Sequence, residues 1–322
     1  MTFRLLSDPT ARATQSLSKR LVTIGLAIGL WAGTVVASAA GSTDAGSTDI
    51  VIPSRDGPRR AIVQASRRGP QPTVIVLHGA TMTAESTIRV SGFAEAAARN
   101  DFAAVFPQGL DRQWNDQRAG GPGGADDVAF LRALVERLVV DGIALPGHIY
   151  LAGISNGGMM SFAMACKAGD LFHGIGTVIA NMPAGIAPCD VPPLPLVMIN
   201  GTDDPMVPYQ GGGVGFSGGR GEVWSVKRTA ELFIRRNGCK AHEEQVVPGR
   251  GWSDATTTTK VTWTSCQSGK PVTLYRIDGG GHQIAGRRAF LPRLLGQSTS
   301  DFSAADEILK IFANEERATA QL

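Results

Sequence analysis

The sequence has little of what marks several classes of protein. It holds 4 cysteines in 322 residues, too few for a small scaffold held together by disulfides. Charged residues make up only 18% of the chain against 43% hydrophobic ones, which is not the composition of a disordered protein. No Cys-x-x-Cys, His-Glu-x-x-His or calcium-loop pattern is present, so we expect no metal site. The length suits one large domain or two ordinary ones.

The chain after residue 40 also lacks an excess of positive charge. The formal net charge is +3, from 31 Lys and Arg against 28 Asp and Glu. Residues 1–40 alone contain four basic residues and one acidic residue, and subtracting these from the totals leaves 27 of each sign. The remaining chain is therefore formally neutral and has no charge bias toward an acidic partner.

The first forty residues have the pattern of a secretory signal peptide. A basic stretch precedes an apolar run of about 16 residues, Leu21 to Val36, and small residues with an Ala-x-Ala pattern follow. The alternative is an uncleaved anchor, but the run is shorter than the ~20 residues of a membrane-spanning helix. No cysteine lies near the cleavage site and no Arg-Arg pair precedes the apolar run, which favours the general secretory route. We expect a secreted or periplasmic protein without a stable membrane anchor.

Four segments follow from this interpretation. They are a signal peptide (1–40), a flexible N-terminal segment (41–49), a single catalytic domain (50–316) and a C-terminal tail (317–322). Basic pairs at Arg59-Arg60 and Arg67-Arg68 lie beside a predicted strand, and we interpret them as edge-strand charge rather than a nucleic-acid surface. We therefore expect no nucleic-acid partner.

Buried strands alternate with helices along the rest of the chain. Continuous apolar runs predict strands covered on both faces, and apolar residues at helical spacing predict the helices between them. A short antiparallel edge, within residues 49–66, is expected to lead the sheet. This pattern predicts an α/β fold with a mostly parallel central sheet and helices on both faces. The predicted strands are 74–77, 103–106, 148–152, 175–180, 194–200, 258–264 and 272–277, and the predicted helices are 91–100, 126–140, 159–167, 222–236 and 304–314.

A nucleophile motif lies between a predicted strand and a helix. Gly153, Ser155 and Gly157 form Gly-x-Ser-x-Gly in the strand–turn–helix context that gives this pattern its meaning. Such a turn strains the serine backbone and lifts its hydroxyl above the sheet, so small residues are needed on both sides. A second match around Ser217 lies in a glycine-rich segment with no strand before it, and we interpret it as a flexible surface loop.

An acid and a base follow in the order that this fold uses. Asp203 and Asp204 come directly after the strand LPLVMIN, and either could be the acid. His282 follows the strand VTLYRI on a run of glycines and is the candidate base. In this reading His282 takes the proton of Ser155, and the carboxylate holds the imidazole in its working tautomer. His148 and His173 are assigned structural roles, and His242 is placed in a polar loop.

The oxyanion hole is expected to use two backbone N–H groups. One belongs to Asn156, the residue after the nucleophile, and one to the loop that follows the first buried strand. In that loop Ala80 is the first choice and Thr81 the second. His78 is expected to shape the loop by hydrogen bonding.

Several motifs together resemble a known family. The strings LHGA, PQGLDRQWN, GGADDVAFL, GISNGGMM, NGTDDPMVPY, RRNGC and GGGH resemble secreted α/β-hydrolases that are poly(3-hydroxybutyrate) depolymerase-like and feruloyl esterase-like. The likeness runs over about residues 50–315. It implies Ser155 as nucleophile, His282 as base and Asp204 as acid, because the family's acid directly precedes the proline of Asp-Pro-x-Val-Pro-Tyr. It also implies that Ala80 and Asn156 provide the oxyanion N–H groups.

One departure from the family affects the substrate prediction. Members commonly read Gly-His-x-Trp-Pro-Gly at the histidine, and Ile284 stands here in place of the tryptophan. The shape of the acyl pocket therefore does not carry over. Trp114 and Asn115 match a Trp-Asn of the family, and they either line the substrate cleft, together with Thr81, or pack in the core.

The four cysteines, Cys166, Cys189, Cys239 and Cys266, allow three pairings. The sequential one is favoured, Cys166 with Cys189 and Cys239 with Cys266, as the family's Arg-Arg-Asn-Gly-Cys pattern also suggests. The alternative, free buried thiols, fits an exported protein less well.

These observations predict a secreted serine hydrolase of carboxylic esters that works through an acyl-enzyme and needs no cofactor. The expected partner is a small or oligomeric ester, first of all a hydroxyalkanoate oligomer. A feruloyl or acetylxylan esterase is the alternative within this class. A serine peptidase or a non-catalytic binding protein with this fold are the alternatives outside it.

Overall fold

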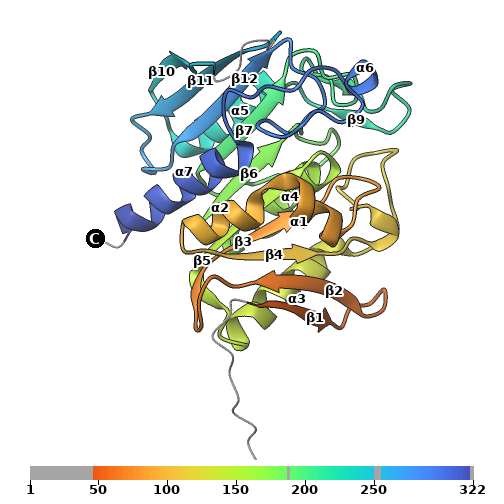
Figure 1. Ribbon diagram of the computed structural model, residues 1–322, viewed down its shortest axis with the longest axis vertical. Coiled ribbons are helices and arrows are strands. Elements are labelled where there is room, and N and C mark those ends of the chain that lie inside the picture. The colour runs from red at the N-terminus through yellow and green to blue at the C-terminus, as the bar shows by residue number, and fades with distance from the viewer. Residues whose placement is uncertain (1–45, 187–188, 250–254, 320–322) are drawn as a thin grey trace, which may run out of the picture. The chain divides into compact units, whose positions relative to one another are not determined.

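Ten strands form a single sheet, and its six central strands run parallel (Figure 1). The strand order is β1-β2-β4-β3-β5-β6-β7-β12-β11-β10. The pairs at both ends, β1 with β2 and β10 with β11, are antiparallel. The strands are β1 (Ser47–Ile52), β2 (Arg59–Gln64), β3 (Gln71–Leu77), β4 (Ala103–Pro107), β5 (Ala144–Ile154), β6 (Gly174–Val178), β7 (Leu196–Gly201), β10 (Ala241–Val246), β11 (Thr257–Thr264) and β12 (Val272–Asp278).

This computed structural model describes residues 46–319 apart from 187–188 and 250–254. All of these residues belong to one compact unit, Asp44–Leu322. The expected signal peptide at 1–40 lies outside the described residues. Within them, no helix is long and apolar enough to cross a lipid bilayer.

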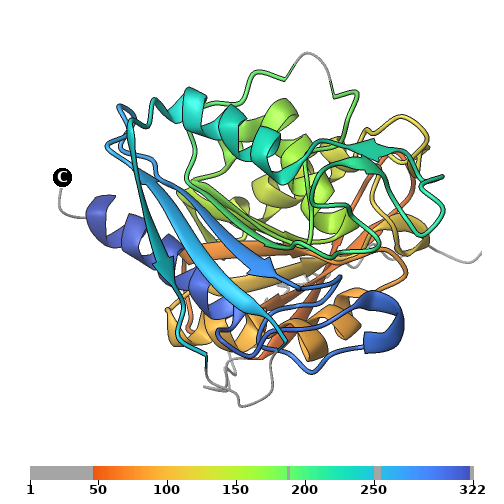
Figure 2. The ribbon, with the colours of Figure 1, turned by 90° about the horizontal axis from the view of Figure 1, so that it is seen from above.

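Helices cover both faces of the sheet (Figure 2). On one face α1 (Ala84–Ser91), α2 (Phe93–Arg99) and α7 (Ala304–Thr319) pack around Phe93, Ile308 and Phe312. On the other face α3 (Asp127–Val140), α4 (Asn156–Ala168) and α5 (Val226–Asn237) pack around Phe130, Phe162 and Phe233. Every residue of β4, β6 and β7 is buried because both faces of these strands are covered.

The architecture is that of an α/β-hydrolase, and the predicted fold class is confirmed. The predicted antiparallel leading edge is also confirmed, as β1 and β2. A small second sheet, β8 (Gly212–Gly213) with β9 (Glu222–Val223), lies outside the main one. Short helices complete the described chain: two 3₁₀ turns, Leu110–Arg112 and Gly169–Leu171, and α6 (Pro292–Leu295).

Three element predictions were wrong in detail. The helix expected from residue 222 begins at Val226, because Ser225 caps it by accepting a hydrogen bond from the Arg228 N–H, and Glu222 belongs to β9 instead. His242 lies in the edge strand β10 rather than in a polar loop. Helix α1 was missed, and Gly92, with a φ of 80°, separates it from α2.

Both ends of the catalytic domain also differ from the predicted ones. Strand β1 begins at Ser47, inside the segment expected to be flexible, because Ser47 pairs with Gln64 in the β1–β2 ladder. Helix α7 continues to Thr319, beyond the expected start of the tail at residue 317.

Arg59 is not an edge-strand charge. Strand β2 lies between β1 and β4, and the Arg59 side chain is only 1% exposed. Its guanidinium lies 3.9 Å from the centre of the Phe130 ring and forms a 2.6 Å ion pair with Asp127, the first residue of α3. This pair fixes α3 against the leading edge of the sheet.

The cysteine prediction is confirmed. Cys166 pairs with Cys189 and Cys239 with Cys266, and no cysteine is free. The first disulfide links α4 to the segment between β6 and β7. The second joins the end of α5 to the end of β11. Such crosslinks persist in oxidising compartments.

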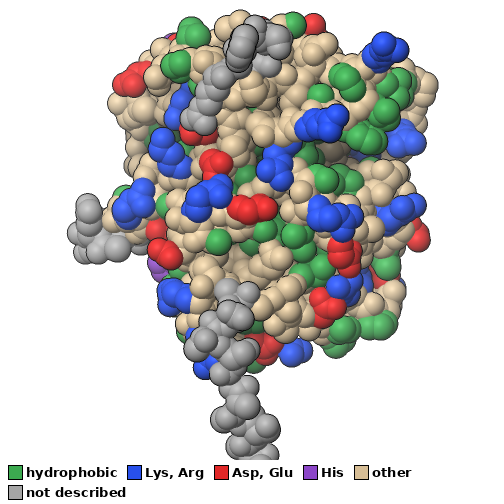
Figure 3. Space-filling model, viewed as in Figure 1, with side chains coloured by type: hydrophobic (Ala, Val, Ile, Leu, Met, Phe, Trp, Pro, Cys, Tyr) green, Lys and Arg blue, Asp and Glu red, His purple; other side chains and the backbone are tan. Residues whose placement is uncertain are grey.

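Basic and acidic side chains are mixed on the face of the molecule shown in Figure 3. No stripe of Lys and Arg crosses this face, in keeping with the even charge of the sequence after residue 40.

Candidate active site

Four loops meet at the carboxyl ends of the parallel strands. The loop after β3 carries Ala80, and the turn after β5 carries Ser155. The loops after β7 and β12 carry Asp204 and His282. Strands that run parallel end at the same edge of the sheet, so these four positions converge although they span about 200 residues of sequence.

Ser155 occupies the sharp turn between β5 and α4. Its φ of 53° and ψ of −119° lie in a region that non-glycine residues rarely adopt, so the backbone is strained there. The neighbouring glycines are needed for space. A Cβ on Gly157 would lie 2.3 Å from the Leu77 carbonyl oxygen, and one on Gly153 would lie 2.3 Å from the Gly157 carbonyl oxygen. The missing side chain at Gly157 lets the turn pack against the end of β3, and the one missing at Gly153 lets the turn close on itself.

A chain of two hydrogen bonds joins the predicted serine, histidine and acid. His282 Nε2 lies 3.0 Å from Ser155 Oγ, and His282 Nδ1 lies 2.7 Å from Asp204 Oδ2. The side chains of His282 and Asp204 are 13% and 2% exposed. The three side chains thus have the spacing of a nucleophile, a general base and the group that orients the base.

Asp204, rather than Asp203, reaches the histidine. Its other oxygen, Oδ1, accepts hydrogen bonds from the backbone N–H groups of Met206 and Val207, both at 2.8 Å. These bonds fix the carboxylate with Oδ2 toward the imidazole. Asp203 is exposed and accepts a hydrogen bond from the Thr202 hydroxyl.

Glycines also let the histidine loop pack closely. The His282 N–H donates to the Leu295 carbonyl oxygen at 2.6 Å, which holds the loop from its back. A Cβ on Gly281 would lie 2.1 Å from that same oxygen, and one on Gly201 would lie 2.2 Å from the Gly280 carbonyl oxygen. Gly281 therefore allows the histidine loop to approach α6 closely, and Gly201 allows the same loop to approach the end of β7.

The expected oxyanion donors lie beside the serine. Asn156 is the first residue of α4, where backbone N–H groups are left free by the helix. Ala80 and Asn156 both line the pocket that contains Ser155. The Thr81 N–H donates to the Arg112 carbonyl oxygen at 2.8 Å, so it is already engaged. This favours Ala80 over Thr81.

His78 is a buried hydrogen-bonding residue. Its Nδ1 lies 2.8 Å from the Gly79 carbonyl oxygen, and its Nε2 accepts from the Gly109 N–H at 2.9 Å. Burial lowers the pKa of His78 to about 4. The imidazole is therefore neutral at pH 7 and ties the loop after β3 to the loop after β4, as the sequence predicted.

Trp114 does not line a cleft. It is fully buried, its indole N–H donates to the His78 carbonyl oxygen at 3.0 Å, and its ring stacks on Phe130. Asn115 is half-buried and donates from its amide to the Ala125 carbonyl oxygen. Of the two alternatives, core packing is therefore the correct one for Trp114, and Asn115 is not among the residues that line the pocket beside Ser155.

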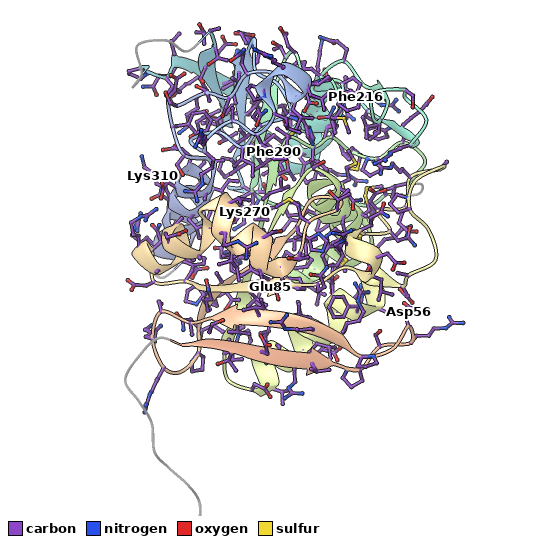
Figure 4. All side chains as sticks on the ribbon, turned by 45° about the vertical axis from the view of Figure 1, so that its right-hand side comes forward. Asp56, Glu85, Phe216, Lys270, Phe290 and Lys310 are labelled. Carbon is purple, nitrogen blue, oxygen red and sulfur yellow. A yellow bond between two sulfur atoms is a disulfide. The ribbon has the colours of Figure 1, made fainter. Side chains whose placement is uncertain are left out.

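Two further positions lie away from the pocket lining. Ile284, which stands where the family has tryptophan, packs against the core under α2 and α7. Ser217, in the second Gly-x-Ser-x-Gly match, is exposed in the loop between β8 and β9. Phe216 beside it is 58% exposed and points outward in Figure 4. The surface-loop interpretation of this motif is confirmed.

A pocket of about 320 Å³ opens beside Ser155. No aromatic side chain of the described part of the chain lines it. Its lining is Ala80, Gln113, Arg118, Gly120, Gly121, Pro122, Ser155, Asn156, Met159, Met206, Val207, Val214 and Arg220.

The sequence reasoning missed the charged residues of this pocket. Arg118 is nearly buried, with 4% of its side chain exposed, and Arg220 comes from the glycine-rich loop that was set aside. Behind them lies Asp116, which is fully buried and whose pKa is raised by burial. The only sequence signal was Asp116 and Arg118 in a loop flanked by Gly120 and Gly121.

No family profile matches the chain. A putative esterase, NocK, of Nocardia uniformis subsp. tsuyamanensis is 29% identical over 254 residues, which cover 73% of this chain and 72% of the relative. Feruloyl esterase D of Neurospora crassa is 28% identical over 184 residues, or 57% of this chain, and the match spans only 54% of that enzyme. Among solved structures, an acetyl xylan esterase from Aspergillus awamori superposes with a TM-score of 0.49 at 14% identity, covering 73% of this chain and 94% of its own.

The relatives named esterase and feruloyl esterase support a place for the chain among feruloyl esterase-like α/β-hydrolases. They also support a carboxylic ester hydrolase as its activity.

Proposed function

We propose that this carboxylic ester hydrolase of the feruloyl esterase-like α/β-hydrolases is a serine esterase, and that Ser155, His282 and Asp204 are its catalytic residues. The observation that carries the proposal is the hydrogen-bonded chain from Ser155 Oγ through His282 to Asp204, beside a pocket that Ser155 lines.

In the first half of the reaction Ser155 Oγ attacks the ester carbonyl carbon while His282 Nε2 takes the hydroxyl proton. Asp204 holds the proton on His282 Nδ1 and stabilises the imidazolium that forms. The backbone N–H groups of Ala80 and Asn156 donate to the oxyanion. His282 then returns the proton to the leaving alcohol, and the acyl group stays on Ser155.

In the second half a water molecule attacks the acyl-enzyme, with His282 again as the base. The acid is released and Ser155 regains its proton. No cofactor is required at any step.

Hydroxyalkanoate oligomers and related esters are the proposed substrates. The pocket beside Ser155 is small and lined by backbone, methionine, valine and arginine rather than by aromatic rings, which suits a short acyl chain with further oxygen atoms. Feruloyl or acetylxylan esters are the second candidate, and the relatives named feruloyl esterase favour them.

Export from the cytoplasm is part of the proposal. Its support is the pair of disulfides, which use all four cysteines of the chain. The basic and apolar segment at residues 1–40 is the proposed signal peptide.

The test is a panel of esters with the purified protein: p-nitrophenyl esters of several chain lengths, methyl ferulate, acetylated xylan and 3-hydroxybutyrate oligomers. Ser155→Ala should abolish all turnover with the fold retained, and Ser217→Ala, in the second Gly-x-Ser-x-Gly motif, should leave it unchanged. Turnover that survives in Ser155→Ala, or no turnover of any ester by the wild type, would contradict the proposal.

A further inference from the structure

The guanidinium of Arg118 lines the pocket beside Ser155. The protein holds it rigidly but does not provide a hydrogen-bond acceptor for each of its N–H groups. The Arg118 side chain is 4% exposed, and its Nε has no hydrogen-bond partner. Its closest carboxylate is Asp116, whose Oδ1 lies 3.5 Å from Nε, beyond normal hydrogen-bond length. A buried charged donor left in this state is costly unless something else accepts from it.

Two glycines allow their loops to pack closely against the aliphatic part of the Arg118 side chain. A Cβ on Gly121 would lie 2.5 Å from Arg118 Cγ, and one on Gly221 would lie 3.1 Å from Arg118 Cδ. The side chain therefore passes between two glycine segments that come from distant parts of the sequence. This fixes the direction of the guanidinium in the pocket wall.

A second arginine faces the same space. Arg220 lines the pocket from the loop between β8 and β9. Burial lowers the pKa of Arg118, Asp116 opposes this effect, and the positive charge of Arg220 adds to it. Two cations thus lie close enough to repel each other. Among the residues that the structure describes, no aspartate or glutamate lines the pocket to offset them.

Asp116 compensates only one of the two charges. It lies behind Arg118, where it also accepts hydrogen bonds from the Asn156 side-chain amide and the Arg118 backbone N–H. The pocket therefore keeps an excess of about one positive charge beside the nucleophile. Arg118 Nη1 is already engaged, because it donates to Met159 Sδ at 2.6 Å, and Nε is the donor left without a partner. An anion between Arg118 and Arg220 would relieve their repulsion.

We propose that this pocket binds a carboxylate of the substrate, so that the preferred esters are half-esters or oligomers with a free acid group a few bonds from the scissile ester. The inference rests on the proposed esterase function and names its substrate class. Planar guanidinium groups match a carboxylate with paired hydrogen bonds, which a neutral ester cannot offer.

The experiment compares matched substrates with and without the carboxylate. One pair is the 3-hydroxybutyrate dimer and its methyl ester, with the acid on the alcohol part of the scissile bond. The other is monomethyl adipate and methyl heptanoate, with the acid on the acyl part. Cleavage of the same ester bond is followed by chromatography, and kcat/KM is measured for each.

In at least one pair, the wild type should prefer the anionic ester by about tenfold or more, the usual effect of hydrogen bonds to a charged group. Arg220→Gln should bring that ratio toward one, and added salt should lower it. Arg67→Gln, a matched change at an exposed arginine outside the pocket, should leave the ratio as it is. The pair that responds identifies which part of the substrate enters the pocket.

A ratio near one in both pairs, unchanged by Arg220→Gln, would overturn the inference while leaving the esterase function intact. Failure of the function is a different result, namely no turnover of any ester. In that case binding of the 3-hydroxybutyrate dimer to Ser155→Ala protein still decides the inference, because calorimetry should show that Arg220→Gln weakens it. Arg118→Lys is the second variant, and it keeps the charge but removes the paired geometry.

Discussion

Asn156 and Trp114 are joined by two reciprocal hydrogen bonds. The Trp114 N–H donates to Asn156 Oδ1 at 2.8 Å, and Asn156 Nδ2 donates to the Trp114 carbonyl oxygen at 2.9 Å. The residue directly after the nucleophile is thereby fixed to the loop that follows β4. Its side chain positions the start of α4, and its backbone N–H is the proposed oxyanion donor.

Asn156→Ala should therefore reduce kcat although the backbone N–H remains. The variant loses both bonds to Trp114 and a third to Asp116, so the donor moves. We expect a loss of about tenfold or more, short of the 10²–10³ for complete removal of an oxyanion donor. Steady-state kinetics measures it, with thermal unfolding as a check on the fold, and an unchanged kcat would contradict this role.

The neighbouring aspartates provide a matched pair of variants. Asp204→Asn should lower kcat by about 10⁴, because the amide favours the wrong imidazole tautomer. Asp203→Asn should have little effect, since Asp203 is exposed and does not contact His282. Equal losses in the two variants would show that the acid is wrongly assigned.

Arg59 and Arg60 are adjacent in β2 and should differ strongly in their effect on stability. Arg59→Met leaves Asp127 charged and buried without its partner, which costs about 3–5 kcal/mol. Arg60→Met breaks exposed ion pairs with Asp49 and Glu85 and should cost less than about 1 kcal/mol. Urea unfolding of both variants measures the difference. Similar midpoints would mean that the buried pair contributes no more than the exposed one.

Acid should destabilise the protein through His78. Its folded pKa of about 4 lies below the ordinary value of 6.5, so between these two pH values the unfolded chain binds a proton that the folded one does not. The free energy of unfolding should therefore fall as the pH drops from 6.5 toward 4, by about 1.4 kcal/mol per pH unit from this residue. Its contribution is constant above pH 6.5.

Urea unfolding at several pH values tests this. His78→Gln should remove that part of the slope, whatever its effect at neutral pH, and His242→Gln, at an exposed position of β10, should not. An identical slope in wild type and His78→Gln would mean that His78 is protonated in the folded protein.

The convergence of Ser155, Asp204 and His282 could be predicted because each follows a buried apolar strand. Parallel strands end at one edge, so the order of strands along the sequence was enough to place their loops together. The choice between Asp203 and Asp204 needed the family resemblance. What decides it physically is the turn in which the Met206 and Val207 N–H groups bind Oδ1, and adjacent acidic residues do not reveal such a turn.

The residues that were missed or misread depend on contacts distant in sequence. Arg118 and Arg220 line the same pocket only because two glycine-rich loops approach each other. Neither loop has a periodic pattern in its sequence. Arg59 looked like surface charge, yet Asp127, 68 residues later, makes its burial possible. Strand β10 lacks apolar alternation because all six of its residues are exposed, so nothing in its sequence distinguished it from a loop.

That exposed strand has a consequence for how the molecules behave in crowded solution. β10 is the last strand of the sheet order, so its outer backbone groups are not paired with another strand of that sheet. Strands with such free groups recruit strands from other molecules and start aggregation. Here the strand carries His242, Glu243 and Glu244, and a second copy aligned against it would bring like charges together. The polar sequence of β10 prevented its prediction as a strand. The same sequence opposes association of molecules through this edge at high concentration.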